Sequence, residues 1–139
     1  MIRVVVESPL GAPTREQIED NKKFAVECCK DCLRRGEAPY ASHLFYDRPG
    51  LLDDQIPAER ELGITAGLLW GDAAEATVVY VDRGISSGMK RGIDRAWEQR
   101  RTVEFRKLSD PDYRMTLDKV TYLFVTDEDK EALFRDVVK

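Results

Sequence analysis

Short apolar segments rich in β-branched residues alternate with amphipathic helical segments along this chain of 139 residues. Residues 2–7, 76–81 and 102–106 have the composition of buried strands. The segments between them carry helix signals, such as a capping box that begins at Thr14 and a proline, Pro57, suited to a first helical position. Because parallel neighbouring strands need a crossover connection, this alternation predicts a doubly wound, mainly parallel sheet in a three-layer α/β/α domain.

Two further strands complete the expected sheet of about five strands. One covers residues 39–42, and the other covers residues 121–125, ahead of a last helix that opens at Asp127. In the helix after Pro57, apolar residues recur at steps of four, three and four, a spacing typical of a core-facing stripe. The expected core face of that helix consists of Leu62, Ala66, Leu69 and Ala73.

The composition excludes some classes of partner. The formal net charge is −4, which argues against binding to nucleic acids or membranes, because both need a basic surface. No apolar run approaches the roughly 20 residues of a membrane span, and the first residues do not resemble a signal peptide. The three cysteines, Cys28, Cys29 and Cys32, indicate a reducing, cytoplasmic location. They lack enough partners for a four-ligand zinc site, so we expect packed thiols, no metal and no cofactor.

Residues 84–92 form a turn rich in glycine and serine between an expected strand and an expected helix. Such turns hold anions, because the free N–H groups and the dipole of the helix start point toward the ligand. An ordinary serine N-cap explains the same residues. Both interpretations stay open at this point.

The carboxyl ends of parallel strands meet at one edge of a sheet, and ligands bind there. This rule brings together residues 7–9, residues 82–89 and the long loop at 43–56, whose length is typical of a functional segment. Glu7 paired with Asp53 or Asp54 offers acid–base chemistry, although both aspartates also suit the start of the next helix. His43 is either part of an aromatic wall with Tyr46 or a structural hydrogen-bonding residue.

Five segments together resemble the nucleoside 2-deoxyribosyltransferase-like superfamily, and more closely a group of small uncharacterised bacterial and bacteriophage domains within it. The resemblance covers residues 1–108 of an expected single domain, 1–139, and leaves residues 109–139 as a strand–helix extension. The matching segments are Glu7-Ser8-Pro9, residues 36–44, Leu52-Asp53-Asp54, residues 59–63 and residues 85–89.

This resemblance implies a flavodoxin-like fold and enzymes that cleave or exchange the N-glycosidic bond of nucleosides or nucleotides. Their nucleophile is a glutamate, and a serine in the turn after the third strand helps to hold a 5′-phosphate. Here Ser86 and Ser87 match that role, with backbone N–H groups from Gly88 and Met89. The resemblance also implies a homo-oligomer of dimeric or higher order.

The sequence departs from the superfamily pattern where the chemistry takes place. Gly92 stands at the position of the nucleophilic glutamate, and Ala76 replaces an aspartate that often opens the third strand. We therefore expect a protein that binds a small ligand, either a phosphorylated nucleoside or an ADP-ribose-like molecule. The expected ligand-binding residues are Ser8, Pro9, His43, Tyr46, Ser86, Ser87, Gly88 and Met89.

Whether the chain is an enzyme stays open at this stage. The alternative is an active N-glycosidase or deoxyribosyltransferase that uses a relocated carboxylate, with Asp53, Asp54 or Glu7 as the catalytic residue. A third interpretation is an assembly module whose cleft has no ligand.

Overall fold

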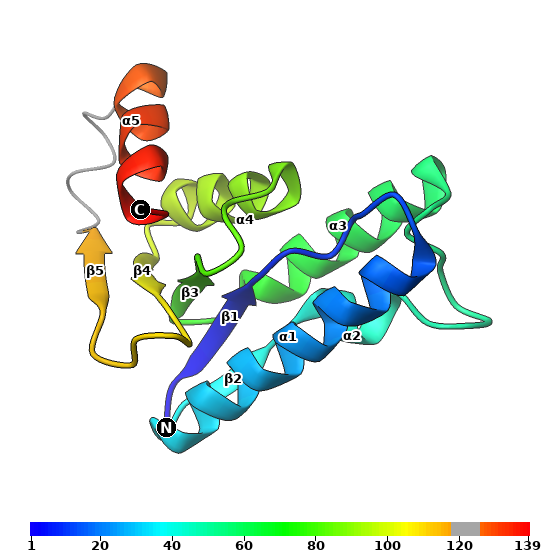
Figure 1. Ribbon diagram of the computed structural model, residues 1–139, viewed down its shortest axis with the longest axis horizontal. Coiled ribbons are helices and arrows are strands. Elements are labelled where there is room, and N and C mark those ends of the chain that lie inside the picture. The colour runs from blue at the N-terminus through cyan, green and yellow to red at the C-terminus, as the bar shows by residue number, and fades with distance from the viewer. Residues whose placement is uncertain (118–125) are drawn as a thin grey trace.

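Five strands form one sheet in the order β2-β1-β3-β4-β5 in the computed structural model, which describes residues 1–117 and 126–139. Figure 1 shows α1 beside β1 and β2, and α4 and α5 at the side of the sheet that carries β3, β4 and β5. The strands are β1 (Arg3–Glu7), β2 (Ala38–Tyr40), β3 (Ala76–Tyr80), β4 (Thr102–Arg106) and β5 (Arg114–Leu117). The helices are α1 (Arg15–Arg34), α2 (Ser42–Tyr46), α3 (Pro57–Gly71), α4 (Ser87–Glu98) and α5 (Asp127–Val137).

The first four strands are parallel, as the alternation of strands and helices predicts. Val5 pairs with Tyr40 of β2 on one side and with Thr77 of β3 on the other. The strand order therefore reverses at β1, and the crevice beyond the ends of β1 and β3 is the place where doubly wound sheets bind ligands. The α/β fold class expected from the sequence is confirmed.

The last described strand differs from the expectation. β5 lies antiparallel to β4, with Phe105 opposite Met115, in a segment for which the sequence predicted no strand. The strand expected at residues 121–125 lies outside the described residues. Among the described residues, the sheet is thus parallel over four strands and has one antiparallel strand, a common arrangement in doubly wound folds.

Alternation along the strands directs side chains to the two faces of the sheet. Val4, Val6, Val78 and Tyr80 face α1 and pack against Cys28 and Cys32, which are fully buried as expected for packed thiols. Val79, Val81, Val103 and Phe105 face the other way, toward α4 and α5. Because Glu7 is two residues beyond Val5 in the same strand, its side chain points to the face that carries α3 and α4.

The expected core face of α3 is wrong. Leu62 and Leu69 are 62% and 69% exposed, whereas Gly67 and Gly71 are buried. A Cβ atom added at Gly67 would lie 2.6 Å from the Cβ of Ser42 in α2, closer than real contacts allow. The helix therefore packs through a row of glycines against α2 and β1, and its apolar stripe faces outward.

The segment at residues 43–56, expected as one long loop, begins within α2. Only its second part, from Asp47 onward, is irregular, with short bridges between Leu52 and both Asp47 and Arg48. In the part of the chain that the structure describes, no helix is both long and apolar enough to cross a bilayer.

Candidate functional site

A pocket opens at the carboxyl ends of β1 and β3, between α3 and α4. It lies at the point where the strand order reverses, as the rule for doubly wound sheets predicts. Seven of the residues expected at the site line it: Glu7, Ser8, His43, Asp54, Ser86, Gly88 and Met89.

Glu7 ends β1 and extends its carboxyl group to α4, into the space beside Gly92. A Cβ atom added at Gly92 would lie 2.6 Å from Oε1 of Glu7 and closer still to Oε2. Burial raises the pKa of Glu7 from 4.5 to about 8, although the charge of Arg101 lowers it. Among the described residues, this carboxyl group has no hydrogen-bond or ion-pair partner. Glu7 thus places a carboxyl group where a side chain at position 92 would otherwise lie.

Arg101 lines the same pocket from the residue before β4, and the sequence interpretation missed it. Its side chain is buried, with one guanidinium nitrogen, Nη1, 3.3 Å from Asp72. Its Nε has no hydrogen-bond partner within the described part of the chain. The preceding residue, Arg100, adopts a left-handed conformation with φ of 58°, which is unusual for a residue with a side chain. The turn that ends α4 therefore directs Arg101 toward the pocket at some conformational cost.

Ser8 and His43 meet on the opposite wall of the pocket. The hydroxyl oxygen of Ser8 lies 3.0 Å from Nε2 of His43. Burial, with a smaller effect from Lys22, lowers the pKa of His43 to about 4, so the imidazole is neutral at neutral pH. A neutral imidazole bonded to a hydroxyl presents a fixed, uncharged polar surface. This arrangement suits recognition of a polar ligand group more than it suits charge neutralisation.

The start of α4 forms the outer end of the pocket. Ser86 caps the helix, since its hydroxyl oxygen accepts a hydrogen bond of 3.3 Å from the N–H of Met89. The N–H groups of Ser87 and Gly88 have no acceptor within the helix, as at any helix start. Ser87 is exposed and lines the outer rim, together with Ser86. Both interpretations of this turn are therefore compatible, because the cap uses the N–H of Met89 and leaves the earlier ones available.

Arg60 in the first turn of α3 faces the start of α4 across the pocket mouth. One guanidinium nitrogen, Nη2, would lie 3.7 Å from a Cβ at Gly88, and the other, Nη1, lies against Gly11. Nη1 also donates a hydrogen bond of 3.0 Å to Asp54. A cation and a helix N-terminus that face each other form a favourable environment for an anion. The sequence interpretation missed Arg60, although it lies in one of the segments that carry the resemblance.

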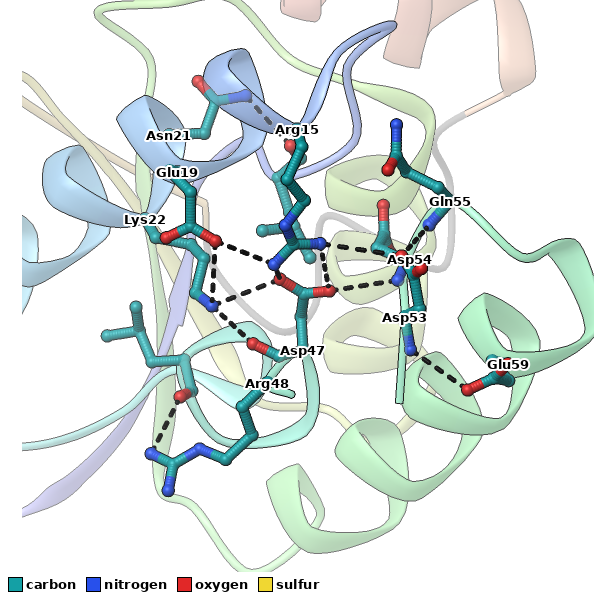
Figure 2. A network of polar contacts seen from close by, with 12 residues as sticks. Arg15, Glu19, Asn21, Lys22, Asp47, Arg48, Asp53, Asp54, Gln55 and Glu59 are labelled. Carbon is teal, nitrogen blue, oxygen red and sulfur yellow. Dashed lines mark hydrogen bonds and ion pairs between the residues drawn. The ribbon is translucent and has the colours of Figure 1, made fainter. Parts of the chain in front are cut away.

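A network of charged residues holds Asp54 in place (Figure 2). Asp47 is buried and contacts Arg15 and Lys22 of α1, and it accepts a hydrogen bond of 3.0 Å from the backbone N–H of Asp54. Burial opposes ionisation of Asp47, but these partners outweigh it and lower its pKa to about 2. Burial raises the pKa of Asp54 itself, and the charge of Arg60 opposes that rise. The network ties the loop that carries Asp54 to α1.

Three of the expected site residues lie away from this pocket. Asp53 is about half exposed, accepts a hydrogen bond of 2.9 Å from the N–H of Gln55, and faces Arg15 in Figure 2. Its carboxylate thus stabilises a local turn. Tyr46 lines an adjoining hollow beside α2, and Pro9 is buried behind the strand end. Of the three carboxylates expected to act in catalysis, the pocket brings together Glu7 and Asp54.

The described residues contain no group of three or more cysteine, histidine or acidic side chains placed to hold a metal ion. Burial raises the pKa of the Cys28 thiol well above its usual value, so this cysteine stays protonated.

Comparison with known proteins agrees with this geometry. The sequence profile of a family described as "Domain of unknown function (DUF7768)" matches residues 3–106. The chain belongs to the DUF7768 family. This match spans all four parallel strands and every helix that lines the pocket. No curated protein matches the chain.

A solved structure also resembles the DUF7768 chain. It comes from work on a 2-deoxyribosyltransferase from the psychrotolerant bacterium Bacillus psychrosaccharolyticus, with a TM-score of 0.56 and 10% sequence identity. The similarity covers 76% of this chain and 72% of that chain. At this identity the likeness shows the fold alone.

Proposed function

We propose that this DUF7768 chain binds a phosphorylated nucleoside, a class that includes ADP-ribose-like molecules, in the pocket between α3 and α4. The observation that carries the proposal is the position of Arg60, whose guanidinium group faces the start of α4 across the pocket mouth. Arg60 and the free N–H groups of Ser87 and Gly88 provide a cation and hydrogen-bond donors for a phosphate. The rest of the ligand extends inward, toward Ser8, His43 and Glu7.

Thermal unfolding with paired ligands tests this proposal. Nucleoside 5′-monophosphates are compared with the matching nucleosides at the same concentrations. A ligand present at about 100 times its Kd stabilises a protein by about 2.7 kcal/mol, which raises the Tm of a chain of this size by roughly 10 °C. We expect such a rise with at least one monophosphate and little with its nucleoside. Equal shifts for both members of every pair would contradict the phosphate assignment.

Arg60→Met is the matching variant. It removes the cation at the pocket mouth, so the effect of the phosphate on Tm is expected to fall. Arg91→Met is the control, because Arg91 also carries a guanidinium group but pairs with Glu61 at 2.8 Å outside the pocket. A loss of phosphate binding in both variants would indicate a general effect of charge instead of a site.

Cleavage of the N-glycosidic bond is the second candidate, and the position of Glu7 favours it. The resemblance assigns the nucleophile to position 92, and the carboxyl group of Glu7 lies in the space beside Gly92. In this reaction a carboxylate oxygen of Glu7 bonds to carbon 1 of the sugar, the bond from carbon 1 to the base breaks, and the base leaves with its electron pair and takes a proton. Water then hydrolyses the ester and regenerates Glu7.

Release of free base, followed by chromatography, tests the second candidate. With a pKa of about 8, about one tenth of Glu7 is ionised at pH 7, so the rate is expected to rise tenfold or less as the pH approaches 9. Glu7→Gln is expected to abolish release while ligand binding persists. Release that continues in Glu7→Gln would exclude this carboxyl group as the nucleophile.

A further inference from the structure

The inner end of the pocket, below the phosphate site, contains two polar groups without partners. One is Nε of Arg101, which is fully buried, and the other is the carboxyl group of Glu7, which has no hydrogen-bond partner among the described residues and is partly exposed to the pocket. An unpaired buried polar group destabilises a folded protein unless a ligand or another function uses it. Both belong to residues that line one pocket, and the charge of Arg101 acts on Glu7. Glu7 and Arg101 thus bring an acceptor and a donor to the inner end of the pocket, away from the mouth at Arg60, and are called the inner subsite here.

The chemistry of the two groups restricts what they accept together. The N–H at Nε of Arg101 only donates, while a carboxyl group accepts when ionised and also donates when protonated. An apolar ligand group would leave the N–H of Arg101 unpaired, and a second phosphate would lie against the carboxyl group. A hydroxyl group satisfies both, since its oxygen accepts from Arg101 and its hydrogen is donated to Glu7.

The distance along α4 from the phosphate site to Glu7 indicates which group of a bound nucleotide would reach the inner subsite. Gly88 lies at the phosphate end and Gly92 lies beside Glu7, and four helical residues rise about 6 Å. A nucleotide with its phosphate at Gly88 therefore places its sugar beside Glu7. A carboxyl group that reaches carbon 1 of a sugar also reaches the hydroxyl group on the neighbouring carbon 2.

We propose that Glu7 and Arg101 bind the 2′-hydroxyl group of the ligand, so that the pocket selects ribonucleotides over 2′-deoxyribonucleotides. The inference rests on the proposed binding of a phosphorylated nucleoside and adds the class of sugar. Sites that hydrogen-bond a hydroxyl group discriminate strongly against the analogue without it, because their own polar groups are then left unpaired.

The test compares the 5′-monophosphates of adenosine, guanosine, cytidine and uridine with their 2′-deoxy counterparts, by isothermal titration calorimetry on the purified chain. For the base that binds, the ribonucleotide is expected to bind about tenfold or more tightly than its 2′-deoxy partner. Equal binding of the two would overturn this inference and leave the proposed function standing. Failure of every compound, and of ADP-ribose titrated in the same way, to bind would overturn the proposed function itself.

Two variants test whether Glu7 and Arg101 cause the preference for the ribonucleotide. Arg101→Lys keeps a cation beside Asp72 but removes the N–H at Nε, so the preference for the ribonucleotide is expected to fall to about threefold or less. Arg95→Lys is the control, because Arg95 also donates to Asp72, at 2.9 Å, and does not line the pocket. A preference that survives in Arg101→Lys, or that is lost equally in Arg95→Lys, would overturn the assignment. Glu7→Leu is the second variant on the subsite, because it removes both oxygen atoms that could accept from the hydroxyl group, and an undiminished preference there would exclude Glu7 from it.

Discussion

At the scale of single residues, Glu7 has a carboxyl group whose surroundings favour the protonated form. Its pKa is about 8 in the folded chain, against an ordinary value of 4.5. Between these two values the folded chain holds a proton that the unfolded chain has released, so the contribution of Glu7 to the free energy of unfolding falls as the pH rises from about 4.5 to 8. The fall is expected to be about 1–3 kcal/mol, after allowing for water that reaches the carboxyl group through the pocket. Urea denaturation across this pH range measures it, and Glu7→Gln is expected to remove it.

A second titrating residue of the same pocket separates this effect from a general dependence on pH. The pKa of His43 is about 4 in the folded chain, against 6.5 ordinarily, so its contribution to stability is lost as the pH falls through this range. The Glu7→Gln variant is expected to lose stability at acidic pH as the natural chain does, but its stability is expected not to decline toward pH 8. The remaining charged groups of the pocket, Asp54, Arg60 and Arg101, are present in both proteins. Parallel profiles for Glu7→Gln and the natural chain would contradict the assignment to Glu7.

At the scale of elements, α3 can lie close to α2 and β1 because it has glycines at the contact. Replacing a glycine by alanine at two positions of α3 tests this. A Cβ at Gly67 would lie 2.6 Å from Ser42, whereas a Cβ at Gly63 would make ordinary contacts of 3.5 and 3.6 Å with Leu52 and Tyr46. Gly67→Ala is expected to destabilise the chain by about 1–3 kcal/mol through overpacking. Gly63→Ala is expected to be neutral or to stabilise it by up to about 1 kcal/mol, because alanine favours the helix. Urea denaturation measures both, and equal effects of the two substitutions would contradict this packing.

The same helix shows how much of the fold the sequence could predict. The spacing of Leu62, Ala66, Leu69 and Ala73 correctly indicates a helix. The buried face of this helix consists of glycines, however, and a search for regularly spaced apolar side chains does not detect them. β5 is a strand of four residues that pairs with β4, and it is too short for alternation to identify. Elements with long apolar runs, such as β1 and β3, were predictable because they are buried on both faces.

At the scale of the whole molecule, the topology made the location of the pocket predictable but not the full set of residues that line it. The reversal of strand order at β1 brings Glu7, Ser8 and Ser86 to one edge of the sheet, as the strand order implied. Arg60 lies in a helix and Arg101 in a turn, and both extend long side chains into the pocket. No local sequence motif predicts that a side chain at such a position lines a pocket. The position of Glu7 beside Gly92 likewise depends on how closely α4 approaches β1.

The outward face of α3 is apolar and exposed, which suggests that it forms an interface in an oligomer. Leu62, Leu69 and Trp70 are each more than 60% exposed on this one helix, and a row of large apolar side chains at such spacing is typical of a helix that pairs with another helix. The opposite face of α3 lines the pocket, so a second copy seated on this stripe would stabilise one wall of the site. We therefore expect the chain to self-associate through α3.

Sedimentation velocity over a range of protein concentrations measures this self-association. Leu69→Glu places a charge in the centre of the stripe and is expected to shift the chain to monomer, since an unpaired charge is excluded from an apolar interface. Leu33→Glu is the matched control, because Leu33 is a similarly exposed leucine, at 55%, on α1 instead of α3. A natural chain that stays monomeric at all concentrations, or an oligomer that survives Leu69→Glu, would exclude this face as the interface. If Leu69→Glu also weakens nucleotide binding while Leu33→Glu does not, then pairing of α3 supports the pocket wall, and assembly and binding are coupled through one helix.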